Sequence, residues 1–242
     1  MIFKKIKIGT LLLALSSLIM VSCTKTTNNG PVITRVLDIQ YFEGVKMSSS
    51  ENIVITQGSN LKVTAIGNEN IVDKVVLDVS NNIWNAHLEP GSYSNYELRY
   101  EITIPTLNYT AVSGSGNITV KNFTAQNHLT ADISGSGNIG LINFEGAGTI
   151  SARISGSGNI LTSGTSTTFD ELIVAISGSG NYIGFPITAN KANITISGSG
   201  DCETTVTDKL HVKISGSGDV RYKGQPTITT NISGSGDLID AN

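Results

Sequence analysis

The stretch Ile133-Ser-Gly-Ser-Gly-Asn-Ile139 decides the fold of this chain of 242 residues, because its Ser-Gly-Ser-Gly motif occurs seven times. Each copy follows an aliphatic residue and precedes Asn or Asp. The copies begin at Ser113, Ser134, Ser155, Ser177, Ser197, Ser215 and Ser233. Their start positions differ by 21, 21, 22, 20, 18 and 18 residues. A repeat of this length is typical of a solenoid, in which each unit buries its apolar side by stacking on its neighbours.

The residues before each motif alternate between apolar and polar side chains, as in Leu210-His-Val-Lys-Ile214. This period of two predicts a β-strand with one buried face. Continued through the motif, the alternation points both glycines inward and points the serines and the following Asn or Asp outward. Glycine suits inward positions where the wall turns or is closely approached. On the outer face, Asp132 and Arg153 take equivalent positions on successive coils and are predicted to pair.

One strand recurs in each repeat with like residues beside like, which predicts parallel stacking of coils ~4.8 Å apart. A parallel β-helix achieves this stacking without crossover helices. We expect right-handed coils, because crossover connections between parallel strands are nearly always right-handed. The predicted fold class is therefore all-β, a right-handed parallel β-helix or β-solenoid with about seven coils marked by the motif.

The segment before the motifs predicts further β structure with little repeat. Its candidate strands are residues 36–40, 52–57, 61–66, 74–79, 83–88 and 96–104. Residues 67–73 can hold one helical turn. We expect this region to cap the N-terminal end of the solenoid, because an exposed parallel edge invites aggregation.

The repeated Ser-Gly-Ser-Gly-Asn-Ile motif, after a β region that ends in the Pro-bearing strand Ile102-Thr-Ile-Pro-Thr-Leu107, resembles a bacterial domain family. The family is called the putative auto-transporter adhesin head GIN domain, and the resemblance covers about residues 35–242. It implies a β-helical fold and implies no catalytic residues. An autotransporter carries a C-terminal membrane barrel of many amphipathic strands. Only nine residues follow Ser233, so we expect no barrel and no self-secretion.

The first 22 residues are predicted to be a signal peptide, because three lysines precede an apolar run too short to span a membrane. The run ends in Met20-Val-Ser-Cys23, which resembles a bacterial lipobox, so Cys23 is the predicted lipidation site. The alternative is an ordinary secretory signal with an incidental Cys. The residue after Cys23 is Thr24 and not Asp, which resembles the signals that sort lipoproteins to the outer membrane. We therefore expect an outer-membrane lipoprotein of the cell envelope, with its periplasmic or surface face left open.

The mature chain divides into three further segments. Residues 23–34 comprise Cys23 and a polar tether that is flexible by composition. Acyl chains on Cys23 contribute ~0.8 kcal/mol for each buried methylene and would anchor the chain to the membrane. The N-terminal β region follows at residues 35–107, and the repetitive β-solenoid occupies residues 108–242.

Charge and motif content argue against several functions. Removing residues 1–22 takes three lysines and no acids from a formal charge of −3, which leaves −3 − 3 = −6 and disfavours nucleic acid. No cofactor is predicted, since the glycine motif lacks the Lys and the helix of a phosphate loop. The three histidines, His87, His128 and His211, lack metal-ligand spacing. Cys202 falls at an inward position and is predicted to be buried.

The residue after the motif changes along the chain from Asn to Asp. It is Asn in the first four copies, then Asp201, Asp219 and Asp237. Stacked carboxylates repel unless they are paired or bound to a cation, so this row is a candidate Ca²⁺ site. The alternative is three solvated carboxylates beside nearby basic residues, which are Lys213, Arg221 and Lys223.

The predicted function is that of a non-enzymatic envelope lipoprotein whose polar surface serves binding or adhesion, to a glycan or an envelope protein. The outward Ser, Thr and Asn rows offer hydrogen bonds, and four tyrosines can stack on sugars: Tyr93, Tyr96, Tyr182 and Tyr222. One alternative is a β-helix enzyme acting on polysaccharide, for which only the Asp row groups carboxylates. Another is a structural spacer or self-assembling envelope component that stacks through its C-terminal coil. Ligand identity, oligomeric state and the presence of a groove stay open.

Overall fold

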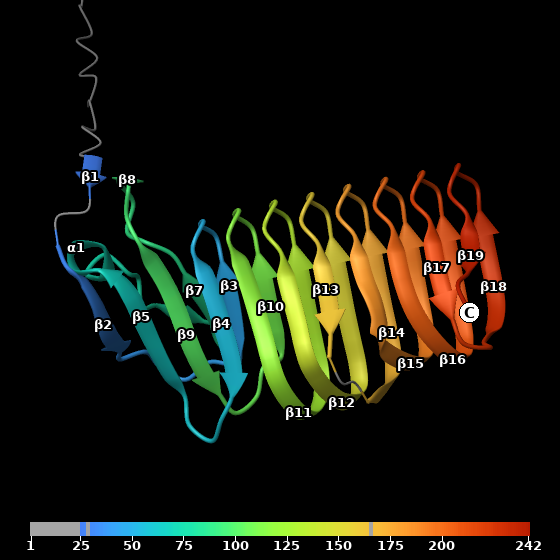
Figure 1. Cartoon of the computed structure of the whole chain (residues 1–242), viewed down its shortest axis with the longest axis horizontal. Helices are drawn as coiled ribbons and strands as arrows, with labels where there is room; N and C mark the ends of the chain where they lie inside the picture. The colour runs from blue at the N-terminus through green and yellow to red at the C-terminus, as the bar shows by residue number, and fades with distance from the viewer. Residues whose placement is uncertain (1–24, 28–29, 165–166) are drawn as a thin grey trace, which may run out of the picture.

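The computed structural model describes residues 25–27, 30–164 and 167–242, so the predicted signal peptide and Cys23 lie outside the described residues. The chain forms an elongated β-solenoid whose motif-bearing coils advance from left to right in Figure 1. In each coil, one strand descends on the side facing the viewer, and a second strand ascends behind it. This path is that of a right-handed coil. The predicted all-β, right-handed parallel solenoid is confirmed.

The strands before the first motif include short and irregular elements. They are β1 (Lys25–Thr27), β2 (Val32–Leu37), β3 (Gly44–Met47), β4 (Asn52–Gln57), β5 (Lys62–Asn68), β6 (Val79–Ser80), β7 (Ile83–Ala86), β8 (Ser92–Ser94), β9 (Leu98–Ile104) and β10 (Tyr109–Val112), with the helical turn α1 (Glu69–Val72) between β5 and β6. The helical turn predicted within residues 67–73 is confirmed by α1. No helix in the described ranges is long and apolar enough to cross a membrane.

The strands of the motif-bearing coils are longer and pair in parallel. They are β11 (Asn117–Ile133), β12 (Ile139–Ile154), β13 (Ile160–Ser163), β14 (Thr168–Ile176), β15 (Tyr182–Ile196), β16 (Cys202–Ile214), β17 (Val220–Lys223), β18 (Thr227–Ile232) and β19 (Leu238–Asp240). Four of them, β11, β12, β15 and β16, run round the lower edge and contribute to both walls. We call one wall the descending sheet, built from β4, β13, β17, β19 and the first halves of these four strands. We call the other wall the ascending sheet, built from β3, β10, β14, β18 and their second halves.

Aliphatic columns fill the space between the two sheets, as the alternation predicts. On the ascending sheet, the residue before the motif stacks in register from Val112 through Ile133 and Ile154 to Ile214, and these side chains are buried. The facing column on the descending sheet includes Ile139 and the buried Cys202, so the predicted inward position of Cys202 is confirmed. At the lower edge, the rings of Phe123, Phe144 and Phe169 stack with centroids 6.0 and 6.1 Å apart.

The two glycines of each motif lie against the backbone of the coil before, so the predicted inward direction is wrong for the position that a Cβ would take. The second glycine of each copy is buried, whereas the first is at least partly exposed. A Cβ on Gly135 would lie 2.1 Å from the carbonyl oxygen of Gly114, and one on Gly137 would lie 1.8 Å from that of Gly116. Such contacts are far inside van der Waals distance, so a side chain at these positions would force the coils apart. The motif is therefore a packing requirement of the turn.

The N-terminal region joins the solenoid out of sequence order. Strands β3 and β4 pair in parallel with β10 and β11, and on their other side they pair in parallel with β7 and β9. The coil of β3 and β4 thus lies between the coil of β7 and β9 and the first motif coil. The sheets continue across residue 107, where the sequence suggested a boundary.

Antiparallel strands cover the N-terminal end, as predicted. Strand β5 pairs antiparallel with β9, and β2 pairs antiparallel with β5 (Figure 1). The strand predicted at residues 74–79 is wrong, because α1 is followed by turns and only Val79–Ser80 forms the short strand β6. Strands β1, β3 and β8 were not predicted. They gain their partners from tertiary pairing, since none shows a long alternation. Strand β1 and the start of β2 lie within residues 23–34, where the sequence predicted a flexible tether.

Candidate functional site

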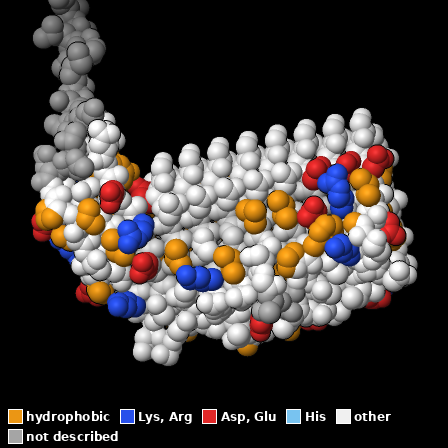
Figure 2. Space-filling model, in the orientation of Figure 1, with side chains coloured by type: hydrophobic (Ala, Val, Ile, Leu, Met, Phe, Trp, Pro, Cys, Tyr) orange, Lys and Arg blue, Asp and Glu red, His pale blue; other side chains and the backbone are white. Residues whose placement is uncertain are grey.

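The motif turns form a straight row along one edge of the solenoid (Figure 1). Each turn hydrogen-bonds to the one before, for example from the Ser136 N–H to the Gly114 carbonyl oxygen at 3.0 Å. Both serines of every copy are exposed. In the space-filling view this edge carries no charged or apolar colour from the first turn to the last (Figure 2). The edge therefore offers a rigid, uncharged row of hydroxyl groups.

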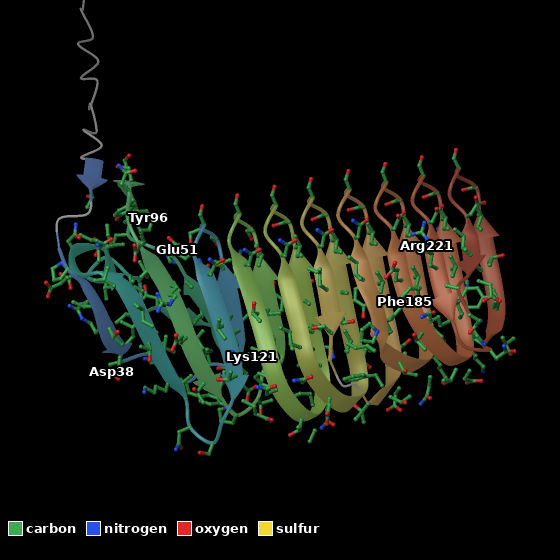
Figure 3. The ribbon with its side chains drawn as sticks, viewed as in Figure 1. Asp38, Glu51, Tyr96, Lys121, Phe185 and Arg221 are labelled. Atoms are coloured by element: carbon green, nitrogen blue, oxygen red, sulfur yellow. The ribbon has the colours of Figure 1, made fainter. Side chains whose placement is uncertain are left out.

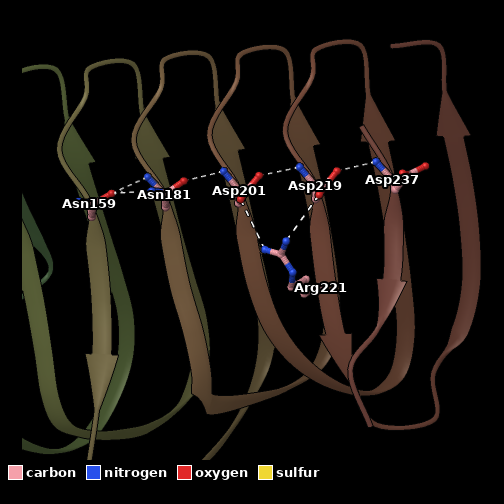
Figure 4. Close-up of polar contacts among 6 residues, drawn as sticks. All are labelled: Asn159, Asn181, Asp201, Asp219, Arg221 and Asp237. Carbon is pink, nitrogen blue, oxygen red and sulfur yellow. Dashed lines mark hydrogen bonds and ion pairs between the residues drawn. The ribbon is translucent and has the colours of Figure 1, made fainter. Parts of the chain in front are cut away.

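The Asn and Asp that follow the motif clamp one coil to the next (Figure 4). The backbone N–H of Asn138 donates to Asn117 Oδ1 at 3.0 Å, and the Asn138 side-chain amide donates to the same oxygen at 2.9 Å. The backbone donation continues along the Asp row, where Asp219 N–H donates to Asp201 Oδ1 at 2.8 Å and Asp237 N–H donates to Asp219 Oδ1 at 2.9 Å. This outward row thus contributes to the stability of the fold.

Arg221 supplies the positive charge beside the Asp row. Its guanidinium nitrogens lie 3.5 Å from Asp201 Oδ2 and 3.6 Å from Asp219 Oδ2 (Figure 4). Each of these two carboxylates therefore has one oxygen on a backbone N–H and the other facing Arg221. Among the described residues, no group of three His, Cys, Asp or Glu side chains is placed to hold a metal ion. Of the basic residues named in the alternative, Arg221 is thus paired with this row, and the Ca²⁺ site stays a prediction.

The four tyrosines named for sugar stacking have different surroundings. The proposal for Tyr182 is wrong, because its side chain is 0% exposed at an inward position between Ile160 and Cys202. Burial raises the pKa of the Tyr182 phenol well above its usual value. Tyr222 is half-buried on β17. Tyr93 and Tyr96 lie side by side near the N-terminal end.

Tyr93 and Tyr96 border a hollow of about 370 Å³ at the N-terminal start of the row of turns. Their rings meet edge to face with centroids 6.1 Å apart. The Tyr96 hydroxyl donates to Glu51 Oε1 at 2.6 Å, and Figure 3 shows the two side chains next to each other. Burial first, and then the bond to Glu51, raises the pKa of Tyr96. The sequence did not mark Glu51, although it stands where each motif has its second glycine.

A series of shallow hollows runs along the outer face of the ascending sheet. From the N-terminal end their volumes are about 400, 260, 230 and 310 Å³. Tyr109 lines both the first and the second hollow, and Arg153 lines both the second and the third. The predicted ion pair lies here, with Arg153 Nη1 3.5 Å from Asp132 Oδ1. The series crosses the strands and follows the solenoid axis, which suits a linear polymer.

Two lysines from neighbouring coils meet near the C-terminal end of this face, and a third lies further along one of their strands. Lys191 and Lys209 are directly opposite each other in register, and Lys213 is exposed on the same strand as Lys209. The first two line the hollow of about 310 Å³ together with His211 and Asn193. Like charges directly opposite on neighbouring strands repel, while Glu171, which lies opposite Lys191 on its other side, offsets part of this positive charge. The sequence shows no basic cluster because these lysines lie in different repeats. Aligning the repeats would have brought Lys191 and Lys209 together.

Comparison with known proteins gives a family and a fold. Residues 41–226 match the family described as "Putative auto-transporter adhesin, head GIN domain". A putative adhesin from Bacteroides fragilis NCTC 9343 is 23% identical, with a TM-score of 0.78 over 89% of this chain and 99% of that chain. A putative adhesin from Parabacteroides distasonis ATCC 8503 is 17% identical, with a TM-score of 0.71 over 90% of this chain and 100% of that chain. No curated protein matches the chain.

A further solved structure, described as a putative lipid binding protein from Parabacteroides distasonis ATCC 8503, is 23% identical to this chain. Its TM-score is 0.71 over 90% of this chain and 100% of that chain. At these identities, the solved structures establish the fold that the chain shares with them.

Proposed function

Because the chain belongs to the family of the putative auto-transporter adhesin head GIN domain, we propose that it is a non-enzymatic, adhesin-like protein of the cell envelope that binds a polysaccharide. The binding surface is the outer face of the ascending sheet. The observation that carries this proposal is the series of hollows that follows the solenoid axis on that face. A polysaccharide laid along it would contact side chains from every coil.

The chemistry of the hollows suits hydroxyl-rich and partly acidic ligands. The side chains that line them include the hydroxyl of Thr195, the amide of Asn193 and the guanidinium of Arg153. Such groups are the donors and acceptors that fix a polar ligand in a shallow site. Lys191 and Lys209 add positive charge at one end, where a carboxylate, sulfate or phosphate on the polymer would relieve their repulsion.

The proposed location follows from the sequence of the first residues. Lipidation of Cys23, after removal of residues 1–22, would hold the solenoid at the outer membrane through the tether of residues 23–34. Labelling cells with an alkyne fatty acid is expected to mark the unmodified protein and to leave Cys23→Ser unmarked. Label on Cys23→Ser would contradict lipidation at this residue. Protease treatment of intact cells then distinguishes the surface face from the periplasmic face.

A glycan array with soluble residues 31–242, with and without Ca²⁺, tests the binding function. We expect a reproducible hit that Ala175→Glu removes, because Ala175 lines the middle hollow on the ascending face and a longer side chain fills it. Ser163→Glu is the matched control, since Ser163 is exposed on the descending sheet. A blank array in both conditions would refute binding to glycan.

Two other functions can be tested with the same soluble protein. A polysaccharide enzyme would release reducing ends from the array hits. Asp201 and Asp219 are poorly suited to act as its acid and base, because each is held in the same way by a backbone N–H and by Arg221. A self-stacking envelope component is favoured by one observation, the exposure of β18 along its whole length. Such a component would show a molecular mass that rises with protein concentration, and the Ile232→Arg variant would stay monomeric.

A further inference from the structure

Glu51 occupies a position that is glycine in every motif copy. Asn52 pairs in register with Asn117, so Glu51 precedes it as Gly116 precedes Asn117. A Cβ on Gly116 would lie 1.7 Å from the Glu51 carbonyl oxygen, which shows that the two turns stack directly. On its other side, Glu51 faces the connection between β7 and β9. That connection departs from the motif turn and includes β8, so a side chain has room there.

The Glu51 carboxylate is buried and only half satisfied. Glu51 is 5% exposed, and its Oε1 accepts the hydrogen bond from the Tyr96 hydroxyl. Oε2 is buried and has no hydrogen-bond partner among the described residues. A buried carboxylate is normally paired with a cation or fully hydrogen-bonded. Within the described ranges, the side chains that line this hollow include neither Lys nor Arg.

The other polar groups around the hollow are also short of partners. The Ser94 hydroxyl lines the hollow, and its oxygen is buried without a hydrogen-bond partner in the described part of the chain. The Tyr100 hydroxyl, whose electrostatic neighbours are Glu51 and Tyr96, is likewise buried without a hydrogen-bond partner among the described residues. The nearby cation Lys74 is already paired with Glu89 at 2.9 Å. Among the side chains that the structure describes around this hollow, none therefore supplies a counter-charge for Glu51.

The ring pair beside Glu51 suits a positive charge. Tyr93 and Tyr96 present aromatic surface to the hollow, and aromatic faces attract cations. The Tyr93 hydroxyl is held by the Glu89 carbonyl oxygen at 2.8 Å, which fixes its ring. A volume of about 370 Å³ is sufficient for a ligand of the size of one sugar ring.

We propose that this hollow binds a protonated primary amine. The ammonium group donates hydrogen bonds to Glu51 Oε2 and Ser94 Oγ and lies against the rings of Tyr93 and Tyr96. Two sources carry this chemistry, an amino sugar and a lysine side chain. The site lies at the N-terminal end of the row of turns, away from the C-terminal lysines of the ascending face, and goes beyond the proposed function of that face.

Calorimetric titration of residues 24–242, which keep β1 paired with β8 at the site, with glucosamine, N-acetylglucosamine and Nα-acetyl-lysine tests the site. We expect glucosamine to bind at least tenfold more tightly than N-acetylglucosamine, which has the same ring without the charge. Binding of Nα-acetyl-lysine with similar strength would support recognition of the amine alone, and its failure to bind beside glucosamine would support an amino sugar. Equal binding of the two sugars, or no heat with either amine, would overturn the proposal.

Variants at the carboxylate separate binding from folding. Glu51→Gln keeps the shape of the side chain and the acceptor for Tyr96, and it is expected to abolish amine binding. Glu97→Gln is the matched control, because Glu97 is exposed in the same region. Tyr93→Leu leaves Glu51 intact and is expected to weaken amine binding severalfold. Unchanged amine binding by a folded Glu51→Gln protein would overturn the proposal, whatever the glycan array shows for the ascending face.

Discussion

At the scale of single residues, the glycines of the motif have the least freedom to change. Replacing Gly178 with Ala would place a Cβ 2.0 Å from the Gly156 carbonyl oxygen. The contact is between backbone atoms, which cannot move aside to make room for the Cβ. We therefore expect a loss of about 1–3 kcal/mol or more in the free energy of unfolding, measured by urea denaturation. Ser179→Ala changes the adjacent exposed residue and is expected to stay within about 0.5 kcal/mol. Equal effects from both variants would contradict the packing role of the glycine.

The buried hydroxyl of Tyr182 is a second residue with a clear expectation. It is buried and has no hydrogen-bond partner among the described residues, so folding removes its contact with water without replacement. Tyr182→Phe keeps the ring and removes the hydroxyl, and we expect a gain of about 1 kcal/mol in unfolding free energy. Tyr41→Phe is the control, because its exposed hydroxyl bonds to Glu43 and contributes little. A loss of stability in Tyr182→Phe would mean that the hydroxyl has a partner.

Arg221 decides how the Asp row responds to calcium. Since its guanidinium faces both Asp201 and Asp219, we expect Ca²⁺ to give no heat in calorimetry and no change in Tm. Arg221→Ala is expected to lower stability by less than about 1 kcal/mol, because these pairs are partly exposed. Without Arg221 the carboxylates repel, so Ca²⁺ is expected to raise the Tm of this variant. Heat from Ca²⁺ and the unmodified protein would restore the cation-site hypothesis.

At the scale of elements, the lower edge of the solenoid depends on the stack of Phe123, Phe144 and Phe169. Phe144 lies in the middle with its neighbours' ring centroids about 6 Å away on both sides, and its side chain is buried. We expect Phe144→Ala to lower the free energy of unfolding by about 3–5 kcal/mol. Leu161→Ala is the control, because Leu161 is 39% exposed on the descending sheet. Comparable losses in the two variants would contradict a structural role for the stack.

The strands themselves show where sequence patterns suffice. The alternation before each motif predicted the ascending strands, because one face of each strand is buried and similar residues of the neighbouring coils lie beside it. The alternation was misleading at residues 74–79, which are mostly irregular after α1. No regular neighbour lies there, so the local preference for β structure is overridden by the packing of the chain end. Strand β3 is only four residues long and depends on β7 and β10 for its pairing.

At the scale of the whole molecule, the coils are expected to be interchangeable units. Deleting residues 197–214 removes one complete coil and joins Ile196 to Ser215. Strand β15, which begins at Tyr182, would then pair with β17, which begins at Val220. In a repeat protein each unit contacts only its neighbours, so we expect a shorter solenoid with native circular dichroism and cooperative unfolding. Deleting residues 197–205 removes half a coil and is expected to abolish cooperative unfolding. Failure of the whole-coil deletion to fold would contradict this modular description.

Taken alone, the sequence determined the repetitive part of this protein. Parallel coils, a buried aliphatic column and the pairing of Asp132 with Arg153 all follow from a period that places like residues side by side. Only the tertiary structure decided where the coil of β3 and β4 lies, which lysines meet on the ascending face, and why Glu51 faces a hollow. These features join residues from different repeats or from the irregular N-terminal region. Their contacts have no period, so they depend on how the finished chain packs and not on any local pattern.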